Sequence, residues 1–156
     1  MKMKKVISAL LVVVMLLPLC LSAQEKVKNL EKKKMEISLD EKGKALVQTL
    51  WKNMKFSNIN KIYESTAYFF QSLHQDGVRN RQEELHLISK LNLDDYELSN
   101  FTVTHNENLI IASYDVTVSE TIKDKRHKRE TTPRTTIFQK IDGNWLWVYH
   151  VNPVKL

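Results

Sequence analysis

The chain has 156 residues, of which 42% are hydrophobic and 27% charged, and it contains one Cys, three Gly and three Pro. These counts exclude collagen-like, low-complexity and disulfide-rich proteins, and the apolar fraction is too high for a wholly disordered chain. The formal net charge is +6, and three of the basic residues lie in the N-terminal segment. The remaining +3 is too small to indicate a nucleic-acid partner, and we expect none.

Residues 1–23 have the composition of a signal peptide. A lysine-rich start precedes an apolar run from Val6 to Leu17, and a short segment ends at Ala23. The run is too short to span a bilayer comfortably, so we predict no transmembrane segment, cleavage after Ala23, and export to the periplasm or the extracellular space. Lipid attachment at Cys20 is the alternative, although Leu19 stands where a bacterial lipobox requires a small side chain.

The mature chain begins with a charged segment and then a helix. Residues 24–37 are rich in Lys and Glu, which predicts a solvated tether or a frayed helix, and a single domain is expected over residues 38–156. Ser38 and Glu41 have the spacing of a capping box, which predicts a helix that begins at Ser38 and runs to about Lys55. Four residues on its apolar face follow at helical spacing: Val47, Leu50, Trp51 and Met54.

Two further helices flank a predicted hairpin. Ile59, Ile62 and Tyr63 keep helical spacing in a short second helix. The segment 67–74 is aromatic and β-prone, and the turn at Asp76-Gly77 joins it to Val78-Arg79. Asn80 and Glu83 resemble a capping box and predict the start of a third helix.

From about Tyr96 the apolar period changes to two, and four strands are predicted over residues 96–105, 109–122, 131–141 and 144–152. The first slips in phase, which a bulge near Ser99 and Asn100 explains. Asp142-Gly143 is the strongest hairpin signal in the chain. The last strand is apolar on both faces, so we expect helices to cover one face and a second subunit or other cover the opposite one.

This order of elements, with the final hairpin around Asp142-Gly-Asn-Trp145, resembles the nuclear transport factor two-like superfamily, and most closely its SnoaL-like branch, which includes secreted bacterial domains of unknown function. The resemblance covers residues 38–153. It implies an α+β fold in which a strongly curved antiparallel sheet wraps three N-terminal helices as a cone-shaped barrel. It also implies a pocket at the open end and a homodimer formed through the sheet. It does not imply a reaction, since fold alone does not settle function.

The candidate proton carriers in such a pocket are His74, Asp76 and His150. A histidine titrates near neutral pH, but a half-buried, hydrogen-bonded imidazole is the ordinary alternative. Asp76 precedes Gly77 in a tight turn, where Asp is favoured because its side chain binds nearby backbone amides. No catalytic motif connects the three residues.

Seven further residues are candidates for the lining of a ligand pocket: Trp51, Tyr63, Phe70, Arg79, Tyr114, Trp147 and Tyr149. Core packing or a dimer interface is the alternative for the aromatic members. The five histidines show no metal-binding spacing, so we expect no metal and no cofactor. The basic segment Lys123–Arg129 is predicted to be a solvated hairpin loop.

Two hypotheses about function remain open. The first is an exported, non-catalytic module that binds a small apolar molecule in the cone or an envelope partner through the sheet. The second is a cofactor-independent isomerase, dehydratase or cyclase in which a pocket Asp or His carries the proton. The second requires an acid or base with a strongly shifted pKa inside the cavity.

Overall fold

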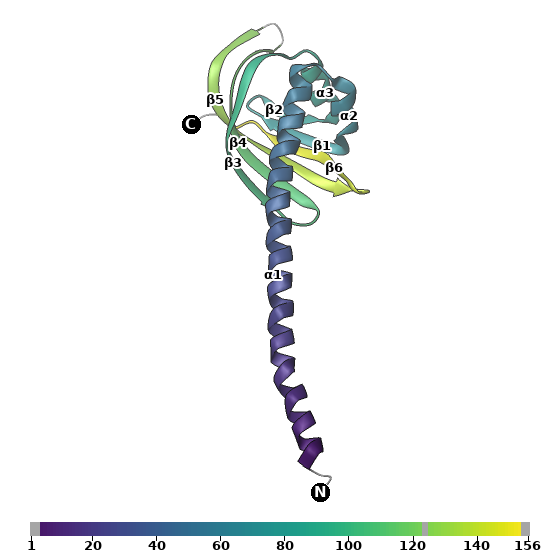
Figure 1. Cartoon of the computed structure of the whole chain (residues 1–156). Helices are drawn as coiled ribbons and strands as arrows, with labels where there is room; N and C mark the ends of the chain where they lie inside the picture. The colour runs from purple at the N-terminus through teal and green to yellow at the C-terminus, as the bar shows by residue number, and fades with distance from the viewer. Residues whose placement is uncertain (1–3, 123–124, 154–156) are drawn as a thin grey trace. The chain divides into compact units, whose positions relative to one another are not determined.

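The computed structural model describes residues 4–122 and 125–153. Within these residues the chain forms three helices and six strands (Figure 1). The helices are α1 (Lys4–Lys55), α2 (Ile59–Glu64) and α3 (Arg81–Ser89). The strands are β1 (Thr66–His74), β2 (Gly77–Asn80), β3 (Asn92–His105), β4 (Leu109–Ile122), β5 (Lys125–Ile141) and β6 (Asn144–Val151).

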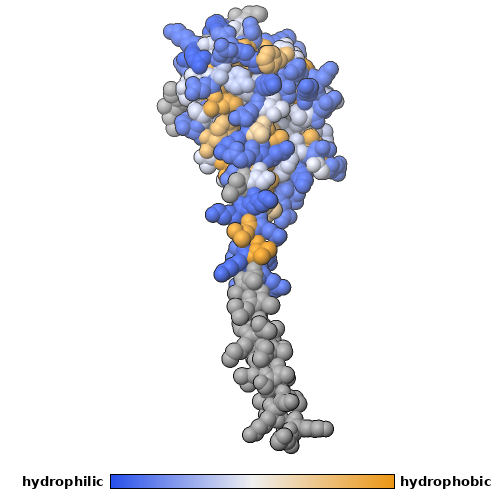
Figure 2. All heavy atoms as spheres, viewed as in Figure 1, coloured by the Kyte–Doolittle hydropathy of each residue, from blue (hydrophilic) through white to orange (hydrophobic). Residues whose placement is uncertain are grey.

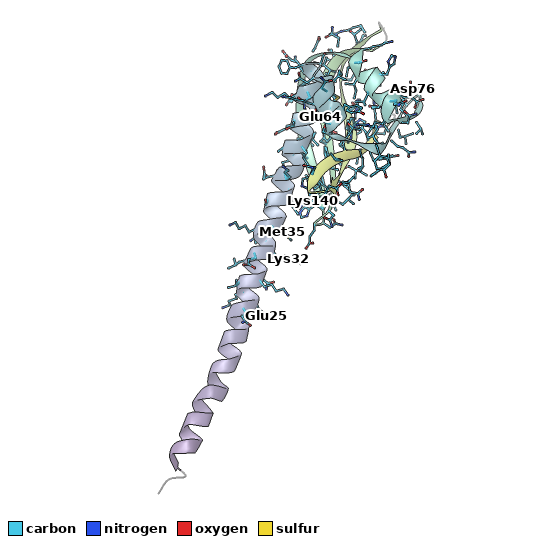
Figure 3. The ribbon with its side chains drawn as sticks, turned by 90° about the vertical axis from the view of Figure 1, so that its right-hand side faces the viewer. Glu25, Lys32, Met35, Glu64, Asp76 and Lys140 are labelled. Atoms are coloured by element: carbon cyan, nitrogen blue, oxygen red, sulfur yellow. The ribbon has the colours of Figure 1, made fainter. Side chains whose placement is uncertain are left out.

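The chain divides into two compact units, Met1–Ser38 and Leu39–Leu156. In the first unit α1 carries exposed side chains over residues 24–35, and this stretch is mostly hydrophilic with a small apolar group (Figure 2). The side chains of Glu25, Lys32 and Met35 project from the helix (Figure 3). Residues 1–3 of the predicted signal peptide lie outside the described residues. Among the described residues, no helix is long and apolar enough to cross a membrane.

The prediction that a helix begins at Ser38 is wrong, because α1 passes through this residue without interruption. Residues 24–41 contain no Gly or Pro and are rich in Lys and Glu, which favour helix. Inside a helix the backbone amides that a capping hydroxyl would satisfy are already bonded to carbonyls of the preceding turn. Glu41 instead accepts a hydrogen bond from Lys44 at 3.0 Å.

In the second unit the six strands form one sheet in the order β2-β1-β6-β5-β4-β3. Every pair is antiparallel except β1 and β6, which are parallel. The predicted Asp142-Gly143 hairpin joins β5 to β6, and both residues have the positive φ, 49° and 81°, that a tight hairpin turn requires. The predicted capping box of Asn80 and Glu83 begins α3.

Irregular positions in the strands bend the sheet and set which face each residue occupies. The predicted bulge in β3 is present, with a register shift between Ser99 and Thr102 and a positive φ of 52° at Asn100. A second irregularity lies in β6: Ile137 pairs with Tyr149 but Phe138 pairs with Trp147, so Val148 is the extra residue. As a result Trp147 and His150 share the inner face of the sheet, and Tyr149 lies on the outer face.

Two strands begin earlier than predicted. β3 starts at Asn92 rather than Tyr96, and β5 starts at Lys125 rather than Thr131. The prediction of a loop over Lys123–Arg129 is therefore wrong for residues 125–129, while residues 123 and 124 lie outside the described residues. The basic strand end pairs with β4, where Thr121 is opposite Arg126, and Arg129 donates to the Asp95 carbonyl at 2.8 Å.

The helices of this unit lie against the concave face of the curled sheet (Figure 1), as the cone-shaped α+β fold requires. The apolar face predicted for α1 is buried, with Val47 fully inaccessible to solvent and Leu50 and Trp51 each 5% exposed. These residues join one core with buried side chains from α2, α3 and the inner face of the sheet, among them Ile62, Phe70, Ile88, Ile110, Val116, Phe138 and Trp147. The core therefore holds the helices inside the curl.

Candidate functional site

A cavity of about 70 Å³ lies inside the second unit, between α1, α3 and the inner face of the sheet. Its walls are mostly apolar, and a few polar side chains converge on it from different elements. The lining residues are Leu50, Trp51, Met54, His74, Glu84, Leu87, Ile88, Leu91, Arg134, Trp147, His150 and Asn152. A concave apolar site with a few convergent polar groups is the usual form of a small-molecule pocket.

One hydrogen-bonded chain crosses the interior behind this cavity. Trp51 Nε1 donates to Tyr114 Oη at 2.9 Å, Tyr114 Oη lies 3.1 Å from Thr136 Oγ1, and Thr136 Oγ1 lies 3.2 Å from His150 Nδ1. Burial raises the pKa of Tyr114, so its hydroxyl keeps its proton. Donation from Tyr114 to Thr136, and from Thr136 to His150, is the orientation that leaves no buried hydroxyl proton unpaired.

His150 ends this chain as a neutral imidazole. Burial lowers its pKa from 6.5 to about 3, and the Arg134 and His74 charges act in the same direction against the opposing effect of Glu84. Its ring lies 5.8 Å from that of His74 and 5.7 Å from that of Trp147, measured between centroids. The pKa of His150 is thus shifted in the direction that favours the uncharged imidazole.

Glu84 is the centre of a second polar group, which the sequence reasoning missed. Its carboxylate is 4% exposed and accepts hydrogen bonds from Ser72 Oγ at 2.8 Å and His74 Nε2 at 2.9 Å, both at Oε2. Burial acts to raise the pKa of Glu84, but the hydrogen bonds and the charge of His74 outweigh it and hold the pKa below its ordinary value. One signal was available, because Glu84 shares a helical face with Ile88.

Two further polar side chains line the cavity. Arg134 is 7% exposed and donates from Nη1 to Thr132 Oγ1 at 2.6 Å and to the Pro133 carbonyl at 3.0 Å. Asn152 follows β6, and its Oδ1 atom is buried with no hydrogen-bond donor among the described residues. An unpaired buried acceptor costs free energy unless a ligand or water supplies the donor.

The structure brings some of the predicted site residues together and separates others. Trp51, His74, Trp147 and His150 line the cavity. Tyr114 contacts the cavity through Trp51. Phe70 is 1% exposed and packs on Trp147 with ring centroids 4.4 Å apart, so it belongs to the core behind the site.

Four predicted residues lie away from the cavity, namely Asp76, Arg79, Tyr63 and Tyr149, and Asp76 is the most informative of them. Its carboxylate lies at the exposed hairpin between β1 and β2, at the edge of the domain (Figure 3), and binds Arg79 Nη2 at 2.6 Å. The hydrogen bond from Arg79 is the main reason that the pKa of Asp76 is lowered. The role of Asp76 as a cavity base is therefore contradicted by its position, since a turn carboxylate paired with arginine faces solvent rather than the cavity.

Tyr63 and Tyr149 also lie outside the cavity. Tyr63 is 53% exposed on α2, where the Arg81 guanidinium stacks 3.8 Å from its ring centroid. In a regular strand Tyr149 would share a face with Trp147, two residues before it. The extra residue at Val148 moves Tyr149 to the outer face, opposite Ile137. Among the described residues, no group of three or more His, Cys, Asp or Glu side chains could hold a metal ion.

Comparison with known proteins identifies the fold through solved structures. No protein-family model matches the sequence, and no curated protein matches it. An NTF2-like (nuclear transport factor two-like) protein of unknown function in nutrient uptake from Rhodospirillum rubrum aligns with a TM-score of 0.65 and 18% identity, over 72% of this chain and 98% of that chain. An NTF2-like protein from Cytophaga hutchinsonii aligns with a TM-score of 0.64 and 10% identity, over 72% and 98%.

The association domain of C. elegans CaMKII also aligns, with a TM-score of 0.57 and 11% identity, over 70% of this chain and 91% of that chain. At identities this low, the likeness bears on the fold alone, and the SnoaL-like branch stays a prediction. The architecture of the second unit, with helices inside a six-stranded curled sheet, is the same in kind. The chain therefore has the fold of the NTF2-like superfamily.

Proposed function

We propose that the chain is a non-catalytic binding module that holds a small, mostly apolar molecule in the cavity between α1, α3 and the sheet. The observation that carries the proposal is a partly open cavity with mostly apolar walls and one unused acceptor, Asn152 Oδ1. A volume of about 70 Å³ corresponds to roughly two to three water-sized groups, and the cavity is partly open, so it takes the end of a short apolar chain. The ligand is therefore a compact, mostly apolar molecule, and Asn152 Oδ1 accepts a hydrogen bond from it or from a water molecule.

The state of the titratable groups supports binding rather than turnover. His150 is neutral and its Nδ1 is engaged by Thr136. Glu84 is ionised and already accepts two hydrogen bonds. A general acid or base works best when its pKa lies near the working pH, and the two shifts recorded here move the pKa values of His150 and Glu84 away from neutrality.

Tryptophan fluorescence provides a direct test, because Trp51 and Trp147 line the cavity whereas Trp145 does not. In a Trp145→Phe variant of the chain from residue 24 onward, titration with pentan-1-ol should give a saturable fluorescence change. At about 100 times its dissociation constant the ligand should also add about 2.7 kcal/mol to the free energy of unfolding. Leu91→Trp, which fills the cavity, should abolish both effects, and Leu146→Trp on the outer face should not. A linear, non-saturable response in the parent would contradict the proposal.

One observation favours a second candidate function, proton transfer by a cofactor-independent isomerase, dehydratase or cyclase. His74 lines the cavity, and its Nε2 is bonded to buried Glu84, which fixes the orientation of the ring. In this alternative His74 is the proton carrier. His74→Gln should then retain ligand binding and lose all turnover of the bound molecule, as followed by exchange of ligand protons in deuterated water. Absence of exchange in the parent chain would remove this candidate.

We also propose that the mature protein is exported and forms a homodimer through the outer face of the sheet. The leader composition supports export, and the half-buried Ile137 and Tyr149 on the outer face support association. Protein recovered from the medium or periplasm should begin at Gln24, whereas a lipid-modified N-terminus at Cys20 would contradict cleavage after Ala23. Light scattering should give a dimer for the parent and a monomer for Ile137→Asp, with Lys140→Asp as the control.

A further inference from the structure

A second hollow, a groove of about 410 Å³, lies on the surface between β2 and α3. Its floor and walls come from the exposed side of the hairpin strand and from one face of the helix, where positions 83, 86, 87 and 90 recur at helical spacing. The lining residues are Val78, Arg79, Glu83, His86, Leu87 and Lys90. The site described above does not use this groove.

Leu87 lines both the groove and the inner cavity. Its half-buried side chain is therefore part of the wall between the two hollows. No polar atom holds a leucine side chain in place, and its staggered rotamers exchange quickly at a partly exposed position. A change of the Leu87 rotamer would therefore open the groove toward the cavity.

One donor atom of a groove residue, Arg79 Nη1, has no hydrogen-bond acceptor among the described residues. Arg79 Nη2 binds both oxygens of Asp76, at 2.7 and 2.6 Å, but Arg79 Nη1 is buried with no hydrogen-bond partner among the described residues. Lys90 lines the same groove and is exposed at the end of α3. The acidic residue of the groove, Glu83, already accepts the Asn80 amide at 2.8 Å. A carboxylate in the groove would compete with Asp76 for the Arg79 guanidinium.

We propose that the groove is the entrance to the cavity and that Arg79 and Lys90 bind the carboxylate of a small amphipathic acid, whose apolar part passes Leu87 into the cavity. This inference rests on the proposed function and adds the ligand class. The cavity accommodates roughly two to three heavy atoms at the end of an apolar chain, and the larger, solvated groove accommodates the charged end and the rest of the chain. The two hollows together thus match an acid with a short hydrocarbon chain.

Hexanoate and hexanamide form the test pair, because they have the same shape and differ in charge. Binding is followed by Trp51 and Trp147 fluorescence in the Trp145→Phe chain. Hexanoate should bind about tenfold more tightly than hexanamide at low salt, and the difference should shrink as the ionic strength rises. Arg79→Gln and Lys90→Gln should each weaken hexanoate about threefold to tenfold and leave hexanamide unchanged. Lys52→Gln, at an exposed position of α1, is the control and should change the affinity of neither probe.

Asp76→Asn provides an independent check, since it releases Arg79 Nη2 without removing the guanidinium. It should strengthen hexanoate binding, even if Arg79→Gln disturbs the hairpin. Leu87→Ala should accelerate association of both probes in stopped-flow measurements, and Leu87→Trp should slow it. Equal affinities of the two probes, or unchanged hexanoate affinity in both Lys90→Gln and Asp76→Asn, would overturn the inference alone. If neither probe nor pentan-1-ol binds, the proposed function itself fails.

Discussion

At the scale of single residues, His150 makes stability depend on pH. Its pKa is about 3 in the folded chain against 6.5 ordinarily, so between these values the unfolded chain binds a proton that the folded chain does not. Stability therefore falls as pH falls through this window, by at most about 1.4 kcal/mol per pH unit. In urea titrations His150→Gln should have a shallower acid-side slope than the parent. The exposed His86→Gln should keep the parental slope, and an equal slope in all three chains would refute the assignment.

Glu84 also makes stability depend on pH, in a lower pH range, and it stabilises the fold in its ionised form. Its pKa is lowered from 4.5, so its contribution is complete above that value and is lost as pH falls through the folded pKa. Glu84→Gln should destabilise the chain by about 1–3 kcal/mol near neutral pH, because Ser72 and His74 lose a charged acceptor in a buried setting. The loss should disappear in strong acid. Glu64→Gln, at an exposed position of α2, should leave the free energy of unfolding almost unchanged. If Glu84→Gln also left it unchanged, the hydrogen bond between Glu84 and His74 would not be formed.

At the scale of elements, α1 approaches the sheet closely at Gly43. A Cβ built there would lie 2.9 Å from Ile110 Cγ2 and 2.9 Å from Val103 Cγ1, and both neighbours are β-branched residues with little rotamer freedom in a strand. Gly43→Ala should therefore destabilise the chain by about 1–3 kcal/mol, although Ala is the better helix former. Lys42→Ala, one residue away on the exposed side, is the control. A stabilised Gly43→Ala variant in thermal melts would mean that α1 sits farther from β3 and β4.

The elements with strong local signals were predictable from the sequence. Strict alternation defined β4 from Leu109 to Ile122, Asp142-Gly143 marked the last hairpin, and Asn80 with Glu83 marked the start of α3. Leu98 and Phe101 are three residues apart and so break the two-residue alternation of apolar residues, which located the bulge at Asn100. Each of these features depends on residues that are neighbours in sequence.

The features that were missed depend on contacts between distant residues. β6 is apolar on both faces, so nothing in its pattern marks the extra residue at Val148 that moves Tyr149 outward and His150 inward. Glu84 appears in the sequence as one charged helix residue among several, and its burial depends on Ser72 and His74 in a neighbouring strand. Ser38 had a helix-start signal, but continuous helix propensity on both sides prevailed. Of the polar residues that line the cavity, His74 and His150 were candidates from the sequence, whereas Glu84 and Asn152 were not.

At the scale of the whole molecule, the two compact units differ in the interactions that stabilise them. The core and the cavity draw on residues from α1 to β6 within the second unit, whereas the described side chains over residues 24–35 are exposed. A helix without a buried face depends on its own propensity and on exposed ion pairs, which contribute little. Stability should therefore reside in the second unit alone, and the ligand-binding properties should reside there as well.

A chain that begins at Ser38 tests this division. It keeps Leu39 on the core and the contact of Asp40 with His105 at 3.5 Å, and it loses the charged helical segment. Its free energy of unfolding should lie within about 0.5 kcal/mol of that of the chain from Gln24, with the same pentan-1-ol affinity. A chain that begins at Val47 should unfold, because it loses residues 38–46 of α1, about two and a half turns that include Gly43 and Leu46. A large loss of stability in the chain from Ser38 would mean that residues 24–37 pack on the domain or on a second copy, and a concentration-dependent melting temperature in the longer chain would identify the second copy as the cause.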